Sequence, residues 1–433
     1  MSGPAPVAAE LTRAGPPRRP GGLLRRRDFR LFWTGQAASS FGSSVTSVAL
    51  PLVAITVLHA STFQVALLTA AAWLPWLVVG LPAGAWVDRL PARPVMLVCD
   101  LVAALLFLSV PVAAWLGTLS VGHLLAVALG GGVVSVFFKT AYQVWLPVLL
   151  ARSELPEGNA KLQGTEAVAQ VAGPGAAGLL ASAFGPVLAL LLDVVSFLGS
   201  AACLLAVRVR EPRRVVDRAA GGLRREIAEG IRFVARDPYL RVMTVFGAVS
   251  NLGLTGYQAI LVVFLVREIG VSPGTVGGLV AAMSLGGVLG AALATPLSQR
   301  LGSARAMLVS NVGSAPFGLL IPLAGPGVRL TYVVVAGVVI GAGAVVGNVL
   351  KGSFRQAYVP HGLLGRAIVS MQVVNYGTIP LGALLGGTLG TVLGLRPAMW
   401  LITGGLGLAG LILLIGPLRH HRELPDRPAP DRT

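Results

Sequence analysis

Long apolar stretches recur along this chain, and they constrain its fold more than any other feature of the sequence. A bilayer core about 30 Å thick needs roughly 20 apolar residues per helix. Twelve stretches reach or approach that length, separated by intervals that carry charge, proline or glycine. They cover residues 32–58, 65–87, 95–116, 121–138, 167–184, 187–207, 242–266, 275–297, 306–323, 330–350, 367–393 and 397–415. We therefore expect an all-α integral membrane protein with twelve transmembrane helices.

Composition argues against a soluble protein. Of the 433 residues, 55% are hydrophobic and 12% are charged, about half the charged share of a typical soluble domain. The two cysteines, Cys99 and Cys203, stand alone inside apolar stretches, without a second cysteine or a histidine at metal-ligand spacing. We expect packed thiols, no metal and no cofactor.

The basic residues predict the orientation of the chain in the membrane. If the N-terminus is cytoplasmic, 30 of the 34 Lys and Arg residues lie on the cytoplasmic side, and only Arg267, Arg329 and Arg396 lie outside. The positive-inside rule then places both termini in the cytoplasm. The net charge of +17 is therefore a signal of topology, and we expect no nucleic-acid partner because no basic domain with interleaved aromatic residues accompanies it.

The apolar stretches fall into two sets of six, so we divide the chain into five parts. They are a disordered basic tail (1–30), a six-helix half (31–207), a central cytoplasmic loop (208–241), a second six-helix half (242–417) and a cytoplasmic tail (418–433). Within the loop, residues 223–235 have the spacing of an amphipathic interfacial helix. A solvated tether is an equally good interpretation.

An internal repeat relates the two halves. A tract around Arg89, after the second stretch, returns around Arg300 after the eighth, 211 positions later. A tract around Gln143, after the fourth stretch, returns around Gln356 after the tenth, 213 positions later. Two repeats at nearly one offset predict pseudo-symmetric halves, a construction used by secondary transporters with the substrate path between the halves.

The first tract resembles the Gly-x-x-x-Asp-Arg-x-Gly-Arg-Arg signature of the major facilitator superfamily. The matching positions, with those of the repeated tract, are Gly84, Asp88, Arg89, Arg93, Arg300 and Gly302. Pro91 and Ala92 depart from the signature. The resemblance extends from about residue 29 to residue 419 and implies the major facilitator fold. It also implies that Asp88 stabilises one conformation through contacts across the cytoplasmic seam between the halves.

The fifth stretch resembles a Gly-Pro-x-x-Gly-Gly motif of antiporters and drug exporters in the same superfamily, with Gly173, Pro174 and Gly178 in place. Proline can kink a helix, and glycine lets a neighbouring helix approach closely. Ordinary packing of small residues explains the tract equally well when it is taken alone.

The branch that contains macrolide-efflux and enterobactin-exporter proteins is the most similar one. The shared positions are Phe137, Phe138, Pro147, Asn159, Ala160, Gly173, Pro174, Asp193, Phe197, Glu229, Phe233, Asn348, Arg355, Gln356, Pro360, Gly365 and Arg366. Where the branch often carries an acidic residue after the glycine of the first span, this chain has Ser43 after Gly42. The resemblance implies proton-coupled drug export but leaves the proton site at that position in doubt.

Charged residues within or at the ends of the apolar stretches are candidates for proton or substrate binding because charge is costly in a membrane. They are Asp193 and Asp100, inside stretches, together with Lys139 at the end of the fourth stretch and Glu166 at the start of the fifth. Asp193 either binds a proton or a cationic substrate, or is a hydrogen-bonded packing carboxylate. Lys139 either pairs with Glu166 or Asp100, or extends to the lipid headgroups. Aromatic and amide residues in the spans could line a cavity: Gln36, Trp73, Trp76, Tyr142, Tyr257 and Gln258.

These features predict a secondary transporter that works as a monomer in a bacterial inner membrane. We expect proton-coupled efflux of an amphipathic small molecule, such as a drug, a macrolide-like compound, a siderophore or another secondary metabolite. Uptake through the same fold and a non-transporting receptor or scaffold remain alternatives. An enzyme is not expected, since the sequence has no catalytic motif, and without a nucleotide-binding P-loop the chain cannot couple transport to nucleotide hydrolysis.

Overall fold

A computed structural model describes residues 22–87, 90–151, 153–209 and 223–425. Throughout these residues the regular secondary structure is helical. The first half contains α1 (Arg27–Thr56), α2 (Thr62–Val78), α3 (Gly80–Val87), α4 (Ala92–Trp115), α5 (Val121–Leu149), α6 (Leu155–Phe184) and α7 (Pro186–Ala206).

The second half begins with α8 (Leu223–Arg236), which lies in the predicted central loop. It continues with α9 (Pro238–Val263), α10 (Pro273–Leu301), α11 (Ser303–Ser314), α12 (Thr331–Tyr358), α13 (His361–Val392) and α14 (Leu395–Ile415). A π-helix at Phe264–Ile269 extends α9, and a 3-10 helix at Ala315–Leu320 extends α11. The helical form of residues 223–236 agrees with the amphipathic pattern of that segment.

Ten helices of the described chain are long and apolar enough to cross a membrane, and Thr62–Val78 is a shorter apolar helix. The sequence predicted twelve full-length helices. Two of the twelve apolar stretches are interrupted instead. The stretch 65–87 is divided between α2 and α3 at Val79. The stretch 306–323 changes from α11 to a 3-10 helix at Ala315, one residue before Pro316, whose backbone nitrogen has no hydrogen to donate.

Three helices extend well beyond the apolar stretches that predicted them. Helix α5 continues to Leu149, α6 begins at Leu155, and α12 continues to Tyr358. A helix needs no apolar side chains once it leaves the hydrocarbon or borders a polar space. Hydropathy alone therefore makes these three helices too short. As a result Lys351 and Arg355, which the sequence analysis counted with a loop, lie within α12.

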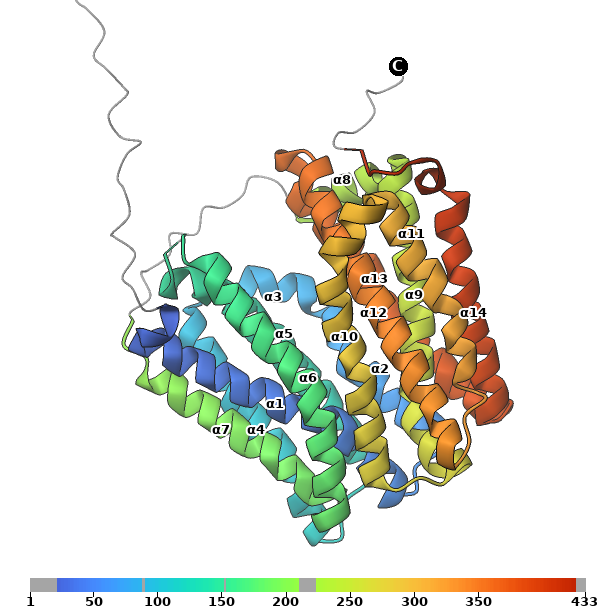
Figure 1. Cartoon of the computed structure of the whole chain (residues 1–433). Coiled ribbons are helices and arrows are strands. Elements are labelled where there is room, and N and C mark those ends of the chain that lie inside the picture. The colour runs from blue at the N-terminus through green and yellow to red at the C-terminus, as the bar shows by residue number, and fades with distance from the viewer. Residues whose placement is uncertain (1–21, 88–89, 152, 210–222, 426–433) are drawn as a thin grey trace, which may run out of the picture.

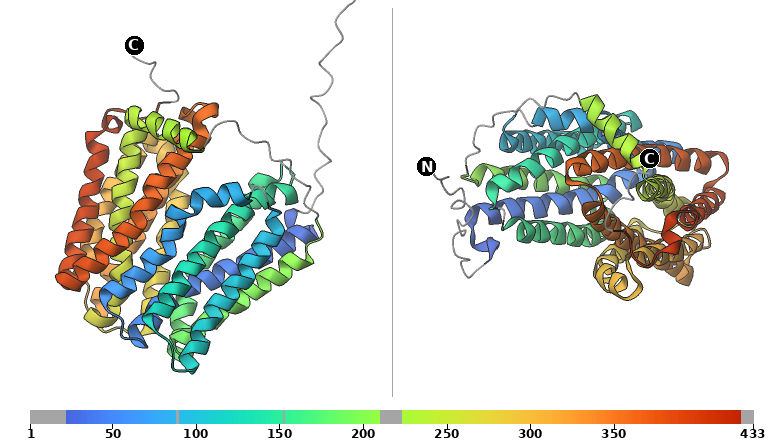
Figure 2. Two further views of the ribbon diagram at one scale, coloured as in Figure 1. Left: turned by 180° about the vertical axis from the view of Figure 1, so that it is seen from behind. Right: turned by 90° about the horizontal axis from the view of Figure 1, so that it is seen from above.

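The helices form two bundles that meet along two seams (Figures 1 and 2). Within the first bundle α1 packs against α6 and α7, and α4 packs against α5 and α7. In the second bundle α9 packs against α13 and α14, and α10 packs against α12. One seam joins α6 to α10, and the other joins α2 to α13.

The described chain begins at the left of Figure 1, where α1 starts, and ends at the top, beyond α14; we call the ends of the two bundles on this side the tail end and the opposite ends the far end. At the far end, one apolar core includes side chains of both halves, such as Val53 and Ile260. At the tail end the core divides in two. One part lies in the first half around Trp145, and the other in the second half around Met307. The halves therefore share one apolar core at the far end and have separate cores at the tail end.

Candidate functional site

Glycines close the seam between α6 and α10 at the far end. A Cβ atom on Gly277 would lie 2.4 Å from the carbonyl oxygen of Pro174 and 2.6 Å from the Cα of Gly178. A Cβ atom on Gly173 would lie 2.4 Å from the Cβ of Ser44 on α1. The Gly-Pro tract of α6 thus packs against α1 on one side and α10 on the other, at distances that only glycine permits.

The seam between α2 and α13 is closed in the same way. A Cβ atom on Gly387 would lie 2.6 Å from the Cβ of Ala66. Near this point the guanidinium of Arg267 donates a hydrogen bond to the carbonyl of Ala60, which joins the second half to the first. The two seams and the shared apolar core therefore hold the halves together at the far end.

Three aromatic side chains, Trp73, Trp76 and Tyr376, meet further toward the tail end; we call them the aromatic cluster. The ring centroid of Tyr376 on α13 lies 6.0 Å from each tryptophan of α2, and the two tryptophans lie 6.4 Å apart. The Nζ atom of Lys139 on α5 lies 5.8 Å from the centroid of the Trp76 ring, within the range of a cation–π contact. The cluster therefore joins the halves near the middle of the bundles, with a cation beside it.

Helix α12 carries two more cations, and one of them, Arg355, reaches the aromatic cluster. The Nζ atom of Lys351 lies 5.8 Å from the centroid of the Phe246 ring. Arg355 is half-buried and interacts electrostatically with Tyr376 of the aromatic cluster. Its Nε atom is buried, and no hydrogen-bond partner for it occurs among the described residues. Arg355 was a candidate from the sequence, whereas Lys351 and Tyr376 were not.

Glu166 lies on the inward face of α6. The buried residues Leu162, Ala169 and Gly173 lie four positions before, three after and seven after Glu166, whereas Val168 and Leu179 on the outward face are 66% and 71% exposed. At about 100° per residue, Glu166 points to the opposite side. Its side chain is exposed there and interacts electrostatically with Tyr142 of α5. An exposed carboxylate thus faces the side of α6 that points into the protein.

Asp193, by contrast, is enclosed by the packing of the first half. The side chain is 1% exposed, and Oδ2 accepts a 2.6 Å hydrogen bond from the hydroxyl of Thr46. Oδ1 accepts a 3.1 Å hydrogen bond from Ser196. A Cβ atom on Gly42 would lie 2.5 Å from Oδ1, so α1 covers the carboxylate directly. This geometry matches the packing interpretation of Asp193 and gives a solute no access to it.

Asp100 is also buried, at the contact between α4 and α7. It is 1% exposed, and the hydroxyl of Ser200 on α7 is the polar group that faces its carboxylate. The structure shows no ion pair between Lys139 and either Asp100 or Glu166, as far as the described residues extend. The three charges are held apart on three different helices.

The gating tract is only partly described, because Asp88 and Arg89 lie outside the described residues. Gly84 belongs to α3. Arg93, in the first turn of α4, donates hydrogen bonds of 3.0 and 3.1 Å to the carbonyls of Leu204 and Leu205 at the end of α7. A cation at the carboxyl end of a helix stabilises the helix dipole, so Arg93 holds α4 and α7 together at the tail end.

The repeated tract forms the turn between α10 and α11. Arg300 lies in the last turn of α10, and Gly302 has a φ angle of +89°, a conformation that favours glycine. A Cβ atom on Gly302 would lie 2.4 Å from the carbonyl oxygen of Arg422. The Ser303 amide and hydroxyl donate to Glu423 over 3.0 and 2.8 Å, and these bonds lower the pKa of that carboxyl. The C-terminal segment is thus tied to the α10–α11 turn.

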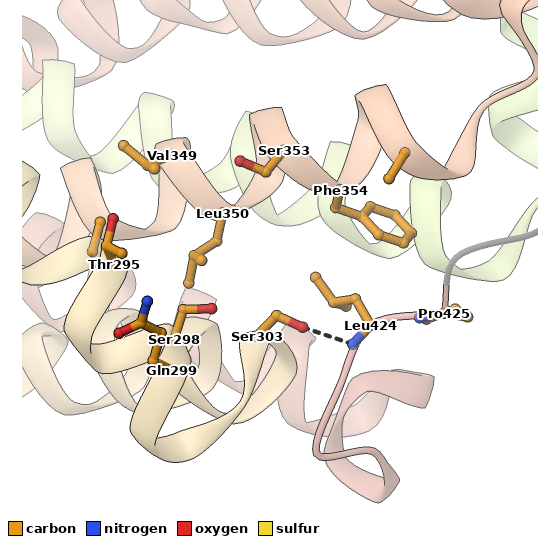
Figure 3. Close-up of a pocket in the computed structure, with 12 residues that line it drawn as sticks. Thr295, Ser298, Gln299, Ser303, Val349, Leu350, Ser353, Phe354, Leu424 and Pro425 are labelled. Carbon is orange, nitrogen blue, oxygen red and sulfur yellow. Dashed lines mark hydrogen bonds between the residues drawn. The ribbon is translucent and has the colours of Figure 1, made fainter.

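This segment covers a pocket of about 290 Å³ between α10 and α12 (Figure 3). Ser298, Gln299 and Ser353 supply polar lining, and Leu424 and Pro425 close one side. Ser353 lies on the face of α12 opposite to Lys351 and Arg355. The pocket therefore belongs to the second half alone and is separate from the aromatic cluster.

The remaining candidates lie near the tail end of α12 and α13. Arg366 pairs with Glu229 of α8 over 2.7 Å, and Gln356 is exposed. A Cβ atom on Gly230 would lie 2.5 Å from the carbonyl oxygen of Arg366. Helix α8 is thus docked onto the start of α13, a position that the amphipathic pattern alone did not specify.

Some of the predicted site residues lie close together in the fold, and others lie apart. Lys139, Trp73, Trp76 and Arg355 come together around the seam, whereas Asp193 and Asp100 do not. Lys351 could have been found from the sequence, since it precedes Arg355 by four positions and therefore shares its helix face. Tyr376 carries no comparable signal, because it lies alone in a long apolar stretch.

The sequence matches known families of membrane proteins. A family model described as "Transmembrane secretion effector" matches residues 21–430. The multidrug efflux pump Tap of Mycolicibacterium fortuitum is 26% identical over 400 residues, covering 89% of this chain and 95% of Tap. The enterobactin exporter EntS of Citrobacter koseri is 27% identical over 418 residues, covering 93% of this chain and 95% of EntS.

Among solved structures, a bacterial homologue of the iron transporter ferroportin is similar in fold at 16% sequence identity. Its inward-facing structure gives a TM-score of 0.72, covering 91% of this chain and 99% of that chain. Its outward-facing structure gives 0.57, covering 91% and 100%. The present arrangement, with the far end closed, is thus more similar to the inward-facing state.

Proposed function

Since the chain belongs to the transmembrane secretion effector family of major facilitator transporters, we propose that it exports an amphipathic small molecule by alternating access, driven by protons. The protein is a multi-pass transporter of the bacterial inner membrane and not an enzyme. The observation that carries the proposal is the division of the core, which is shared by both halves at the far end and separate at the tail end.

We assign the tail end to the cytoplasm and count twelve spans. Ten helices meet the length and hydropathy of a span, and the pairs α2 with α3 and α11 with its 3-10 extension would supply the other two. The positive-inside distribution supports this orientation, since most of the basic residues belong to the tail end. In this orientation the structure corresponds to an inward-facing state that can load a solute from the cytoplasm.

Export, rather than uptake, is favoured by the similarity to an efflux pump and to an exporter that each align over most of their length. The substrate of this chain is not carried over from either relative. The seam geometry gives a physical basis for a reversible gate, because glycine-to-backbone contacts can separate without leaving buried charges unpaired.

For proton coupling we propose Glu166 as the residue that exchanges the proton. It is exposed and faces inward on α6, the helix whose far half forms the seam with α10. We assign Asp193 to packing of the first half because Thr46, Ser196 and Gly42 surround its carboxylate. A carboxylate that water reaches in only one of two conformations can couple proton movement to the conformational cycle.

The test of export compares metabolites in cells and medium of the native host, with and without the gene, by mass spectrometry. We expect one compound to accumulate inside the deletion strain and to return to the medium when the wild-type gene is restored. The Glu166→Gln protein, made at the same level, should fail to restore its release. A compound that is instead depleted inside the deletion strain would establish uptake and overturn the proposal.

A further inference from the structure

We infer that Lys139 and Arg355, which interact with the aromatic cluster from opposite halves, and Lys351, one helical turn from Arg355, bind the anionic group of a flat aromatic solute. This inference rests on the proposed transport function and names the chemical class of the transported molecule. We call the three cations together with the aromatic cluster the cation–aromatic site.

The cations of α12 have no carboxylate to neutralise them in the spans of their own half. The sequence contains no Asp or Glu between Glu268 and Glu423. Glu268 pairs with Arg396 at the far end, and Glu229 of α8 pairs with Arg366 of α13. The carboxylate of Asp237, at the start of α9, accepts hydrogen bonds from the Tyr358 hydroxyl of α12 and from the first amides of α9. Positive charge within a membrane protein is costly and normally finds a partner. A transported anion would be that partner for Lys351 and Arg355.

Lys351 and Arg355 lie close to each other on α12, which raises the energetic cost of leaving them without a carboxylate. They are four residues apart and therefore lie on the same face of the helix, where like charges repel. The Nε atom of Arg355 is buried without a hydrogen-bond partner among the described residues. A guanidinium has five N–H donors in a planar arrangement that suits a carboxylate, sulfonate or phosphate group.

The aromatic cluster supplies the other half of the recognition. Trp73, Trp76 and Tyr376 offer ring faces and edges at the point where α2 meets α13. Flat aromatic solutes stack on such rings, and the cation of Lys139 already lies over one of them. A solute with an aromatic body and an anionic group would therefore find both of its parts matched in one place.

The site also draws its charges from both moving parts. Lys139 belongs to the first half, whereas Lys351 and Arg355 belong to the second. An anion bound between them attracts both halves, and its differential affinity for the two states would shift the equilibrium between them. Binding and conformational change would then be linked by the charge of the solute itself.

Glu166 is the carboxylate of the first half that faces inward and remains exposed. It interacts with Tyr142, and the structure shows no ion pair between it and the three cations within the described residues. With three cations and one carboxylate, the surroundings of the aromatic cluster stay positive. A cationic solute of the same shape would meet repulsion there, so the site should discriminate by charge.

The experiment uses the purified full-length protein in detergent and two dyes built on one xanthene scaffold. Fluorescein is anionic and rhodamine 6G is cationic near neutral pH, and fluorescence anisotropy measures the binding of each. We expect fluorescein to bind with a Kd at least about tenfold lower than rhodamine 6G, since a charged hydrogen bond is worth roughly one factor of ten.

Three variants test whether the named cations are responsible. Arg355→Gln and Lys139→Gln should each weaken fluorescein binding about tenfold, while Arg355→Lys should retain most of it. Arg236→Gln removes an exposed arginine of α8, outside the site, and serves as the matched control with unchanged affinity. Size-exclusion profiles and melting temperatures confirm folding. If Arg355→Gln does not fold, Lys139→Gln decides, because that side chain is exposed.

The outcomes separate this inference from the proposed function. Equal or tighter binding of rhodamine 6G, or unchanged fluorescein binding in both folded glutamine variants, overturns the cation–aromatic site. Everted membrane vesicles then test transport by the same protein. Proton-dependent accumulation of rhodamine 6G without fluorescein binding would leave export standing and refute the anion site. Fluorescein binding without any proton-dependent transport of either dye would leave the anion site standing and refute proton-coupled export.

Discussion

The substitution Gly277→Ala should open the far end of the protein. The added Cβ atom would lie 2.4 Å from the carbonyl oxygen of Pro174 and 2.6 Å from the Cα of Gly178. Non-bonded carbon contacts are normally about 3.5 Å, so α6 and α10 must separate by about 1 Å. Both obstacles are backbone atoms, which cannot rotate away as the end of a flexible side chain can.

The magnitude follows from the cost of overpacking. Forcing an extra methyl group into a closed contact costs about 1 to 3 kcal/mol. Because the far-end contact exists only in the state shown here, this cost applies to that state and not to one in which α6 and α10 are apart. The equilibrium should therefore shift toward the open far end by roughly 5- to 150-fold.

The assay measures access to a cysteine at Ala181, a buried residue of α6 near the far end. Cys99 and Cys203 are first replaced by alanine, and a membrane-impermeant maleimide is added from outside whole cells. Labelling of Ala181→Cys should be slow alone and several-fold faster with Gly277→Ala. The adjacent substitution Gly278→Ala is the matched control, since a Cβ atom there meets nothing within 4 Å. Unchanged labelling with Gly277→Ala, or an equal increase with Gly278→Ala, would refute the reasoning.

Three further predictions concern polar contacts of the two halves. Asp193→Asn should transport at a rate close to wild type. Asp193→Ala should lower stability by about 1 to 3 kcal/mol in thermal unfolding because the buried Thr46 hydroxyl loses its acceptor; an inactive but stable asparagine variant would contradict the packing assignment. Gly302→Ala should release the C-terminal segment, seen as faster tryptic cleavage after Arg422, because that turn has a φ angle of +89° and faces the Arg422 carbonyl; unchanged cleavage would count against it. The lowered pKa of Glu423 means that its docking is fully present above the ordinary carboxyl pKa and is lost as pH falls through the lower value. A spin label attached at Pro425→Cys, in the protein without Cys99 and Cys203, should therefore become more mobile on acidification in the wild-type background, whereas in Glu423→Gln it should be mobile at every pH.

Hydropathy predicted where helices occur better than where they end. The apolar stretches were sufficient to locate nearly every helix of the described chain, since the bilayer imposes a length on each one. They placed the end of α12 at residue 350, however, and thereby assigned Lys351 and Arg355 to a loop. A helix that borders a polar space between two bundles carries charge within its length, and a hydropathy pattern cannot distinguish such a space from the cytoplasm.

Asp193 and Lys139 illustrate a second limit of prediction from the sequence pattern. Asp193 lies inside an apolar stretch and Lys139 at the end of one, so the cost of charge in a membrane made both candidates. The fold separates them, because Asp193 meets the hydroxyl of Thr46 on a neighbouring helix and Lys139 meets the ring of Trp76 at the seam. Which helix face meets which neighbour depends on packing between segments far apart in the chain, and a pattern of hydropathy along the chain does not report that packing.

The chemistry of the seams explains why a solute can move the halves. In lipid there is no hydrophobic gain from pressing two apolar helices together, so the far-end seam depends on close van der Waals contact at glycines such as Gly178 and Gly277. Near the seam between α2 and α13, the guanidinium of Arg267 also donates a hydrogen bond to the backbone carbonyl of Ala60 in the other half. Contacts of this kind sum to a few kcal/mol, and converting a 1:99 equilibrium into 99:1 requires about 5.5 kcal/mol of differential binding. An anion held between Lys139 and Arg355 can supply energy on that scale only where the two cations come close together around it. The free energy of binding an anion at the proposed site is therefore comparable to that of the seam contacts, so binding of the solute can determine which end of the protein is open.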